Sequence, residues 1–227
     1  MKTVWLAALL AASGPVCAQD LASAAPDVTA PSSPQPAPVT PATREGLLLT
    51  VWDESSLDAV RAFGRLMGSQ ALRGDPVVER VAPGIVALVA VGPLLRPVGR
   101  DEIEPLGLSS AQALALARTQ LRAALPPLDQ VARPVAADVI GRLQGPAESS
   151  RVLLHADWAS LAQGQQGQLL VAPASPDMLL WSADTSAAGR QALRRAKREA
   201  LESGDRRASL PTRTLLRWTP LGWEPVH

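Results

Sequence analysis

The chain has 227 residues, 47% of them hydrophobic, and its formal net charge is +1. A charge so close to zero gives no overall field to attract nucleic acid, so we expect no nucleic-acid partner. The single cysteine, Cys17, excludes a disulfide within the chain and a metal site built from several thiolates.

The first eighteen residues have the pattern of a secretory signal peptide. Lys2 provides a positive start, residues 4–12 are apolar, and small residues around Cys17 precede an expected cleavage after Ala18. This pattern predicts a periplasmic or secreted protein whose mature chain has no thiol. Lipidation of Cys17 is the alternative, and it is disfavoured because Gly-Pro-Val at residues 14–16 lacks the Leu-small-small approach of lipoproteins.

Residues 19–43 are rich in proline, alanine, serine and threonine. This composition offers little apolar area to bury, so it predicts a disordered linker. Residues 44–227 are then expected to form one globular domain with a single hydrophobic core. No later apolar stretch approaches the roughly 18 residues of a membrane-spanning helix, so we do not expect the mature protein to cross a membrane.

The domain is expected to begin with a strand at residues 47–52, followed by a helix. The apolar residues of that helix recur at helical spacing; they are Leu57, Val60, Phe63 and Met67. Two β-rich runs then flank Pro83-Gly84, a pair suited to the centre of a type II turn, which predicts a hairpin. Residues 94–98 are expected to add a short third strand.

The clearest helical segment covers residues 106–125. Ser109 and Gln112 have the spacing of a capping box, and two prolines stop the helix after residue 125. Residues 128–137 are then expected to form a loop, and residues 139–143 a strand.

Residues 152–154 form an apolar run typical of a central strand. Asp157 is expected to cap a helix over residues 158–163, because its carboxylate can accept a bond from the first free amides. Gly164 suits the left-handed position that follows a helix.

The C-terminal third is expected to contain two strand pairs and one helix. Residues 167–172 and 177–183 predict a hairpin, and residues 186–203 an amphipathic helix. Strands at 213–218 and 223–226 close the chain. Because most neighbouring strands are joined by short turns, we expect an α+β fold with a largely antiparallel or mixed sheet and three to four helices.

The order of five stretches resembles the YtpQ-like family of bacterial proteins of unknown function. The stretches are PGIVALVAVG, LGLSSAQALALARTQLRAALP, ESSRVLLHADW, GQLLVAPASPDMLLW and LGWEPV. The resemblance covers roughly residues 75–226 and implies a shared architecture, but the family has no established activity to carry over. This chain has Gln120 where the family pattern has Asn, and Glu148 where it has Asp. Its export signal also separates it from the many members that look intracellular.

Three residues are candidates for catalysis: Glu148, His155 and Asp177. His155 is the one histidine inside the expected domain before the C-terminal residue, and Asp157 would share its strand face if the strand continued that far. The simpler interpretation is a polar residue at a strand end. Glu148 and Asp177 lie at expected strand ends that the family resemblance aligns, and they would be the acid and base of a carboxylate-dependent hydrolase. No metal or cofactor motif is found, so none is expected.

The helix at 186–203 is the best candidate for a binding surface. Its basic residues are Arg190, Arg194, Arg195, Lys197 and Arg198. They would attract anionic lipid headgroups or an acidic partner, unless they only form a solvated helix face. Trp181, Trp218 and Trp223 lie on expected strands and are interpreted as core residues.

The sequence therefore predicts an exported protein that acts without catalysis. It would bind a protein, a peptide or another component of the bacterial cell envelope. The alternative is the carboxylate-dependent hydrolase, and no residue pattern decides between the two.

Overall fold

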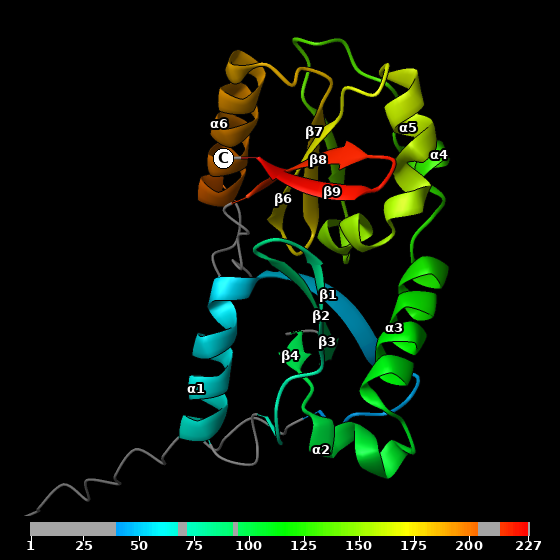
Figure 1. Cartoon of the computed structure of the whole chain (residues 1–227), viewed down its shortest axis with the longest axis vertical. Helices are drawn as coiled ribbons and strands as arrows, with labels where there is room; N and C mark the ends of the chain where they lie inside the picture. The colour runs from blue at the N-terminus through cyan, green and yellow to red at the C-terminus, as the bar shows by residue number, and fades with distance from the viewer. Residues whose placement is uncertain (1–39, 68–71, 93–94, 204–213, 227) are drawn as a thin grey trace, which may run out of the picture. The chain divides into compact units, whose positions relative to one another are not determined.

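The computed structural model describes residues 40–67, 72–92, 95–203 and 214–226. The expected signal peptide and the linker up to residue 39 lie outside these ranges. Residues 38–227 form one compact unit. It has the predicted α+β fold, with two antiparallel sheets in place of one (Figure 1). In the ranges given above, no helix combines the length and the apolar character that crossing a bilayer requires.

The first sheet has the strand order β1-β3-β2, and β4 also pairs with β3. Its strands are β1 (Leu47–Asp53), β2 (Val78–Ala82), β3 (Ile85–Val91) and β4 (Arg96–Pro97). All seven residues of β3 are buried, because both faces of this apolar central strand are covered. The hairpin predicted around Pro83-Gly84 is confirmed, and Gly84 has the positive φ of 79° that a type II turn needs.

Helices cover both faces of the first sheet. They are α1 (Leu57–Met67) and α3 (Ser110–Ala124). The 3₁₀ turn η1 (Glu54–Ser56) precedes α1, and α2 (Arg100–Ile103) and the 3₁₀ turn η3 (Glu104–Leu106) precede α3. The predicted capping box is confirmed: the Gln112 amide donates to Ser109 Oγ at 3.2 Å, and the Ser109 amide donates to Gln112 Oε1 at 2.8 Å. Alternate residues of β3 face the two sides, so Val89 packs in the core under α3 and Leu88 in the core under α1.

The second sheet has the strand order β5-β7-β6-β8-β9. Its strands are β5 (Gly141–Gln144), β6 (Leu170–Ser175), β7 (Met178–Ser182), β8 (Leu215–Thr219) and β9 (Gly222–Val226). One face packs against α6 (Ala187–Ser203) through Leu170, Leu180 and Leu193. The other face contributes Val171 and Leu179 to the same large core that the first sheet faces.

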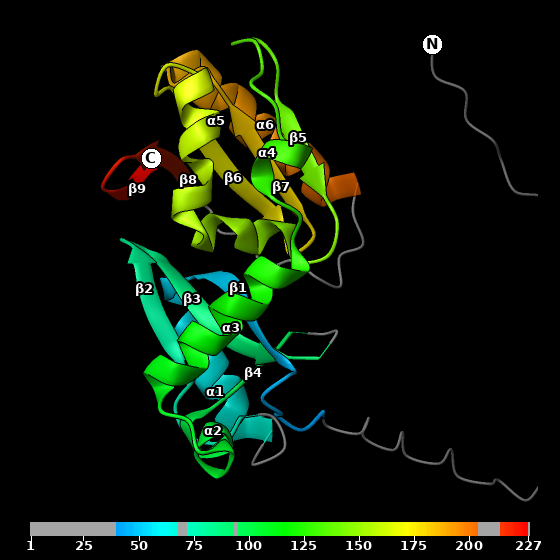
Figure 2. The same cartoon turned by 90° about the vertical axis from the view of Figure 1, so that its right-hand side faces the viewer.

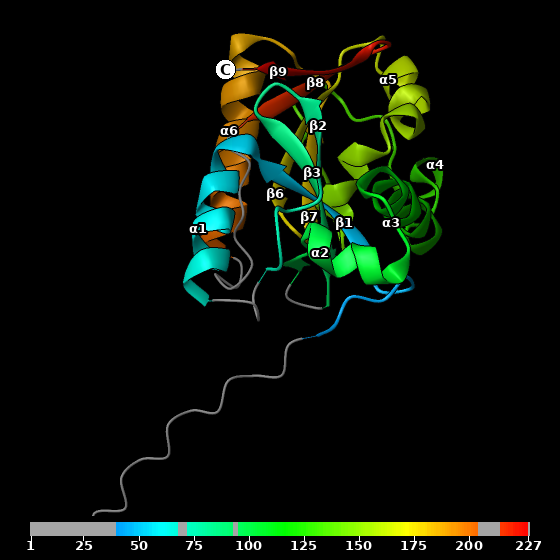
Figure 3. The same ribbon diagram turned by 60° about the horizontal axis from the view of Figure 1, so that its bottom comes forward.

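The helices therefore lie in two outer layers. α1 and α6 cover the outer faces of the two sheets on one side, as two views agree (Figures 1 and 3). Figure 2 looks onto the opposite side, where α3 lies with α4 (Leu128–Val131) and α5 (Ala159–Gly164).

Several local predictions are wrong between residues 128 and 167. Residues 152–154 do not form a strand, because they belong to the 3₁₀ helix η4 (Glu148–Leu153) and its C-terminal end. The expected loop at 128–137 begins with the helical turn α4. Gly164 is the last residue of α5, and the left-handed positions fall later, at Gln166 and Gly167.

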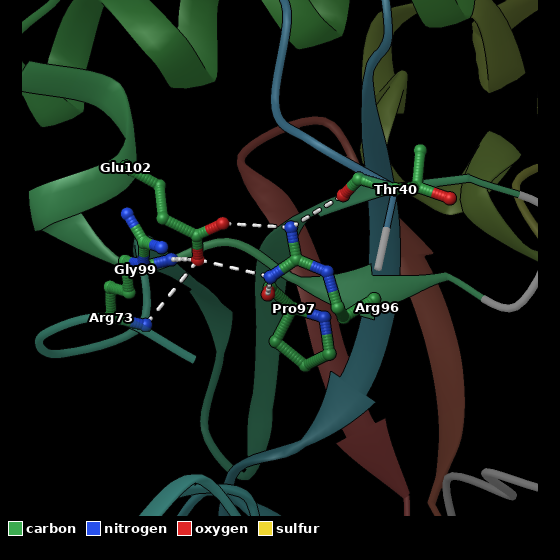
Figure 4. A network of polar contacts seen from close by, with 6 residues as sticks. All are labelled: Thr40, Arg73, Arg96, Pro97, Gly99 and Glu102. Carbon is green, nitrogen blue, oxygen red and sulfur yellow. Dashed lines mark hydrogen bonds and ion pairs between the residues drawn. The ribbon is translucent and has the colours of Figure 1, made fainter. Parts of the chain in front are cut away.

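Polar contacts fix the chain where it enters the first sheet. Figure 4 shows that Arg96 pairs with Glu102 through both carboxylate oxygens, at 3.0 and 2.7 Å, and also donates to the Thr40 carbonyl at 2.9 Å. Burial raises the pKa of Glu102, but the hydrogen bonds from Arg96 and from the amides of Gly99 and Arg73 outweigh burial, and the pKa is lowered. These contacts hold the backbone from Thr40 onward, before the expected domain start at residue 44.

Replacing Gly141 with alanine is expected to destabilise the second sheet. Gly141 lies opposite Trp181 in the β5–β7 ladder, and a Cβ added at Gly141 would overlap the indole ring. We expect a loss of about 1–3 kcal/mol in the free energy of unfolding, measured by urea denaturation. Gly167, where an added Cβ meets nothing but φ is positive, serves as a control for backbone strain alone. A G141A loss no greater than that of G167A would contradict the overlap.

Candidate functional site

A hollow lies where the C-terminal end of α3, the turn α4 and the start of α5 meet. Figure 2 shows these three elements on one side of the molecule. The volume of the hollow is about 380 Å³. Its lining includes Arg122, Leu125, Leu128, Asp129, Arg151 and Asp157. A hollow of this size falls within the range of small-ligand sites in proteins.

A second hollow of about 110 Å³ adjoins the first. Leu128, Asp129, Asp157 and Ser160 line both hollows, so these residues lie at the junction. Arg133 lines only the smaller one, and its guanidinium donates to the backbone carbonyl of Asp129. The junction therefore has two carboxylates and a hydroxyl, and each hollow has at least one arginine.

The rim of the larger hollow holds an ion pair that is open to solvent. Arg122 Nη2 lies 3.3 Å from Asp157 Oδ1, and the two side chains are 59% and 31% exposed. Exposed pairs of this kind contribute only about 0–1 kcal/mol. The pair can therefore exchange its partners at little cost in free energy.

The inner wall of the hollow contains a buried arginine. Arg151 is 1% exposed and forms a two-pronged ion pair with Glu148, with Nε–Oε2 at 2.7 Å and Nη2–Oε1 at 3.0 Å. Its Nη1 also donates to the Pro126 carbonyl at 2.8 Å. Three of its five N–H groups thus have acceptors among the described residues, and the guanidinium is held rigidly.

The 3₁₀ geometry of η4 explains this ion pair. Side chains three residues apart are eclipsed in a 3₁₀ helix, whereas they would point to opposite faces of a strand. Two buried indoles then satisfy backbone carbonyls of the helix: Trp158 donates to Arg151 O at 3.0 Å, and Trp223 donates to Val152 O at 2.7 Å. Burial of all six residues of η4 is possible because their polar groups find such partners.

His155 lies in the 3₁₀ turn η5 (His155–Trp158) and not at a strand end. Its Nε2 lies 2.9 Å from the Thr219 carbonyl, so this nitrogen carries the proton. The ring stacks on Trp218, with centroids 5.6 Å apart, and meets Trp223 edge-on. Asp157, expected as a helix cap, makes no capping hydrogen bond and accepts from Arg122 instead.

The other two catalytic candidates do not line the two hollows described above. Both oxygens of Glu148 are bonded to Arg151, and the residue is 7% exposed. Asp177 lies exposed in the turn between β6 and β7, where its backbone carbonyl accepts from the Gly145 amide. This geometry gives the hydrolase hypothesis no support.

The basic residues of α6 divide into three groups. Arg195 and Arg198 are exposed, next to the exposed Glu199. Arg190 and Arg194 are half-buried and donate to the backbone carbonyls of Thr185 and Val226. Lys197, which was expected on the binding surface, is 6% exposed and faces the interior.

Burial lowers the pKa of Lys197 from 10.5 to about 8, against the opposing attraction of Asp53. The helix therefore does not present the five positive charges as one surface. Within the described ranges, no group of three or more His, Cys, Asp or Glu side chains is placed to hold a metal ion.

No family model matches this chain, and neither a curated protein nor a solved structure does. The resemblance to the YtpQ-like family therefore stays a prediction. The hollows were not predictable from the sequence, because Arg122, Asp129 and Asp157 form no motif.

Proposed function

We propose that the chain is an exported binding module of the bacterial cell envelope, which takes a small ligand into the hollow between α3, α4 and α5 without transforming it. The observation that carries this proposal is the combination of a hollow of about 380 Å³ with an apolar wall and charged groups of both signs. Binding sites typically pair an apolar lining with a few placed polar groups in this way.

The surroundings of the candidate catalytic residues support binding over chemistry. Glu148 is engaged by Arg151, and His155 is engaged by a backbone carbonyl and two indoles. Among the described residues, neither the Glu148 carboxylate nor the His155 ring forms a hydrogen bond with a serine, threonine or cysteine side chain. The export signal read from residues 1–18 supports the location in the envelope.

A screen of small soluble fragments by saturation-transfer NMR tests the proposal. We expect fragments to bind the mature protein and to lose binding in Ser160→Trp, because Ser160 is exposed at the junction of both hollows and a large ring there would fill them. Glu199→Trp on the exposed side of α6 is the matched control and should bind as the parent does.

Two outcomes would count against the proposal. One is fragment binding that is equal in the parent and in Ser160→Trp, which would place the ligand elsewhere. The other is turnover of an esterase, peptidase, phosphatase or glycosidase substrate by the parent that is lost in Glu148→Gln. Such turnover would support the hydrolase hypothesis.

A further inference from the structure

We propose that the hollow binds a small zwitterion, of the size of a free amino acid or a dipeptide. Its ammonium group would lie at the junction beside Asp129 and Asp157, and its carboxylate would be bound by Arg122 and Arg151. This inference rests on the proposed function and names the ligand class of the same site.

The balance of charge around the two hollows favours a ligand with both signs. Arg122, Arg133 and Arg151 contribute three positive charges to the lining, and Asp129 and Asp157 contribute two negative ones. Glu148 lies behind Arg151 and adds a third negative charge. The sum, three minus three, is zero. A phosphate or sulfate would be repelled by the two aspartates, and a polyamine by the arginines.

The positions of the charges separate the two ends of the ligand. Asp129, Asp157 and the Ser160 hydroxyl line both hollows, so together they form an acceptor group at the junction. An ammonium group has three N–H donors and no acceptor, which matches this group. Arg151 lies in the larger hollow only, with two N–H groups beyond its three described bonds.

The ion pair at the rim can be replaced by the two charges of the ligand. The Arg122–Asp157 pair is solvent-exposed and weak, so a zwitterion can replace both partners at once. Its carboxylate then takes the place of Asp157 at Arg122, and its ammonium takes the place of Arg122 at Asp157. No charge is left unpaired in the exchange, which limits the desolvation cost.

An apolar wall would receive the side chain of the ligand. Leu125, Leu128 and Leu154 are buried residues that line the larger hollow, together with Pro126 and Pro127. This wall favours ligands with apolar side chains over glycine or serine.

Calorimetric titration of the mature protein with free amino acids and unmodified dipeptides tests the inference. The same dipeptides are then used N-acetylated or C-amidated, which removes one charge at a time. We expect each block to weaken binding at least ten-fold. Asp157→Asn should bind about ten-fold more weakly and lose its sensitivity to acetylation, whereas Arg122→Gln should lose its sensitivity to amidation.

Arg195→Gln, on the exposed face of α6, is the matched control and should bind like the parent. Circular dichroism of each variant checks that it is folded. Dipeptides that bind equally well with both ends blocked would contradict the proposal that the ligand is a zwitterion. So would zwitterions that fail to bind while neutral fragments still occupy the hollow, and in that case the proposed function survives. If neither class binds the hollow, both proposals fail.

Discussion

Replacing Arg151 with methionine is expected to lower the free energy of unfolding by about 3–5 kcal/mol. The substitution leaves the Glu148 carboxylate at 7% exposure without the guanidinium that both of its oxygens contact. Breaking one side of a buried ion pair has a large cost because the remaining charge stays desolvated. The Pro126 carbonyl also loses its donor. Urea denaturation followed by tryptophan fluorescence measures the loss.

Two further variants decide whether the buried charge is the cause. The double variant Glu148→Leu with Arg151→Met removes both charges and should recover most of the lost free energy. Arg217→Met breaks the half-exposed pair with Glu224 and should lose less than about 1 kcal/mol. A double variant as unstable as Arg151→Met alone would show that packing of the arginine, and not the unpaired carboxylate, dominates.

Replacing Lys197 with methionine is expected to stabilise the protein by about 3 kcal/mol at pH 7. Burial lowers the pKa of Lys197 to about 8 from 10.5, and each pKa unit corresponds to about 1.4 kcal/mol. Methionine is close to lysine in length and removes the charge. Arg198→Met, one residue further along α6 and exposed, is the control and should change stability little.

The same residue makes stability depend on pH in the alkaline range. Because the folded pKa lies below the unfolded value, the unfolded chain binds more protons between pH 8 and 10.5, and the free energy of unfolding rises with pH across that window. The chain has no tyrosine, and its only other lysine is Lys2 in the expected signal peptide, so few other groups titrate there. Parallel curves for the parent and Lys197→Met would contradict this assignment.

The regular elements were predictable because their residues follow simple periodicities. The buried run of β3 and the Pro83-Gly84 turn identify a hairpin without any tertiary information. The capping box at Ser109 fixes the start of α3, since both of its hydrogen bonds are local.

The 3₁₀ helix η4, which carries Arg151 in the inner wall of the hollow, was not predictable in the same way. Val152 and its apolar neighbours satisfy the pattern of a strand, but the 3₁₀ helix is fixed by partners far along the chain, such as the Trp223 indole. The one local signal was the spacing of Glu148 and Arg151, which allows an ion pair only in a helical geometry.

The burial of Lys197 shows the limit of reading a helix face from its charges. Leu193 and the partly buried Ala196 and Ala200 form the inner side of α6, and Lys197 is buried with them. The sequence-based prediction placed the charge of Lys197 on the exposed surface, because lysine side chains are rarely buried. Only the packing of α6 onto the second sheet reveals the difference.

If the hollow between α3, α4 and α5 is a ligand site, a bound ligand will perturb the backbone amides that line it. A backbone amide chemical-shift map tests this on the chain without residues 1–18, mixed with the low-molecular-weight fraction of a cell-envelope extract. We predict that the largest shifts occur at Asp129, Ala156, Asp157 and Ser160. Shifts concentrated on the exposed face of α6 or on the β8–β9 hairpin, or no shifts at these four amides, would contradict it.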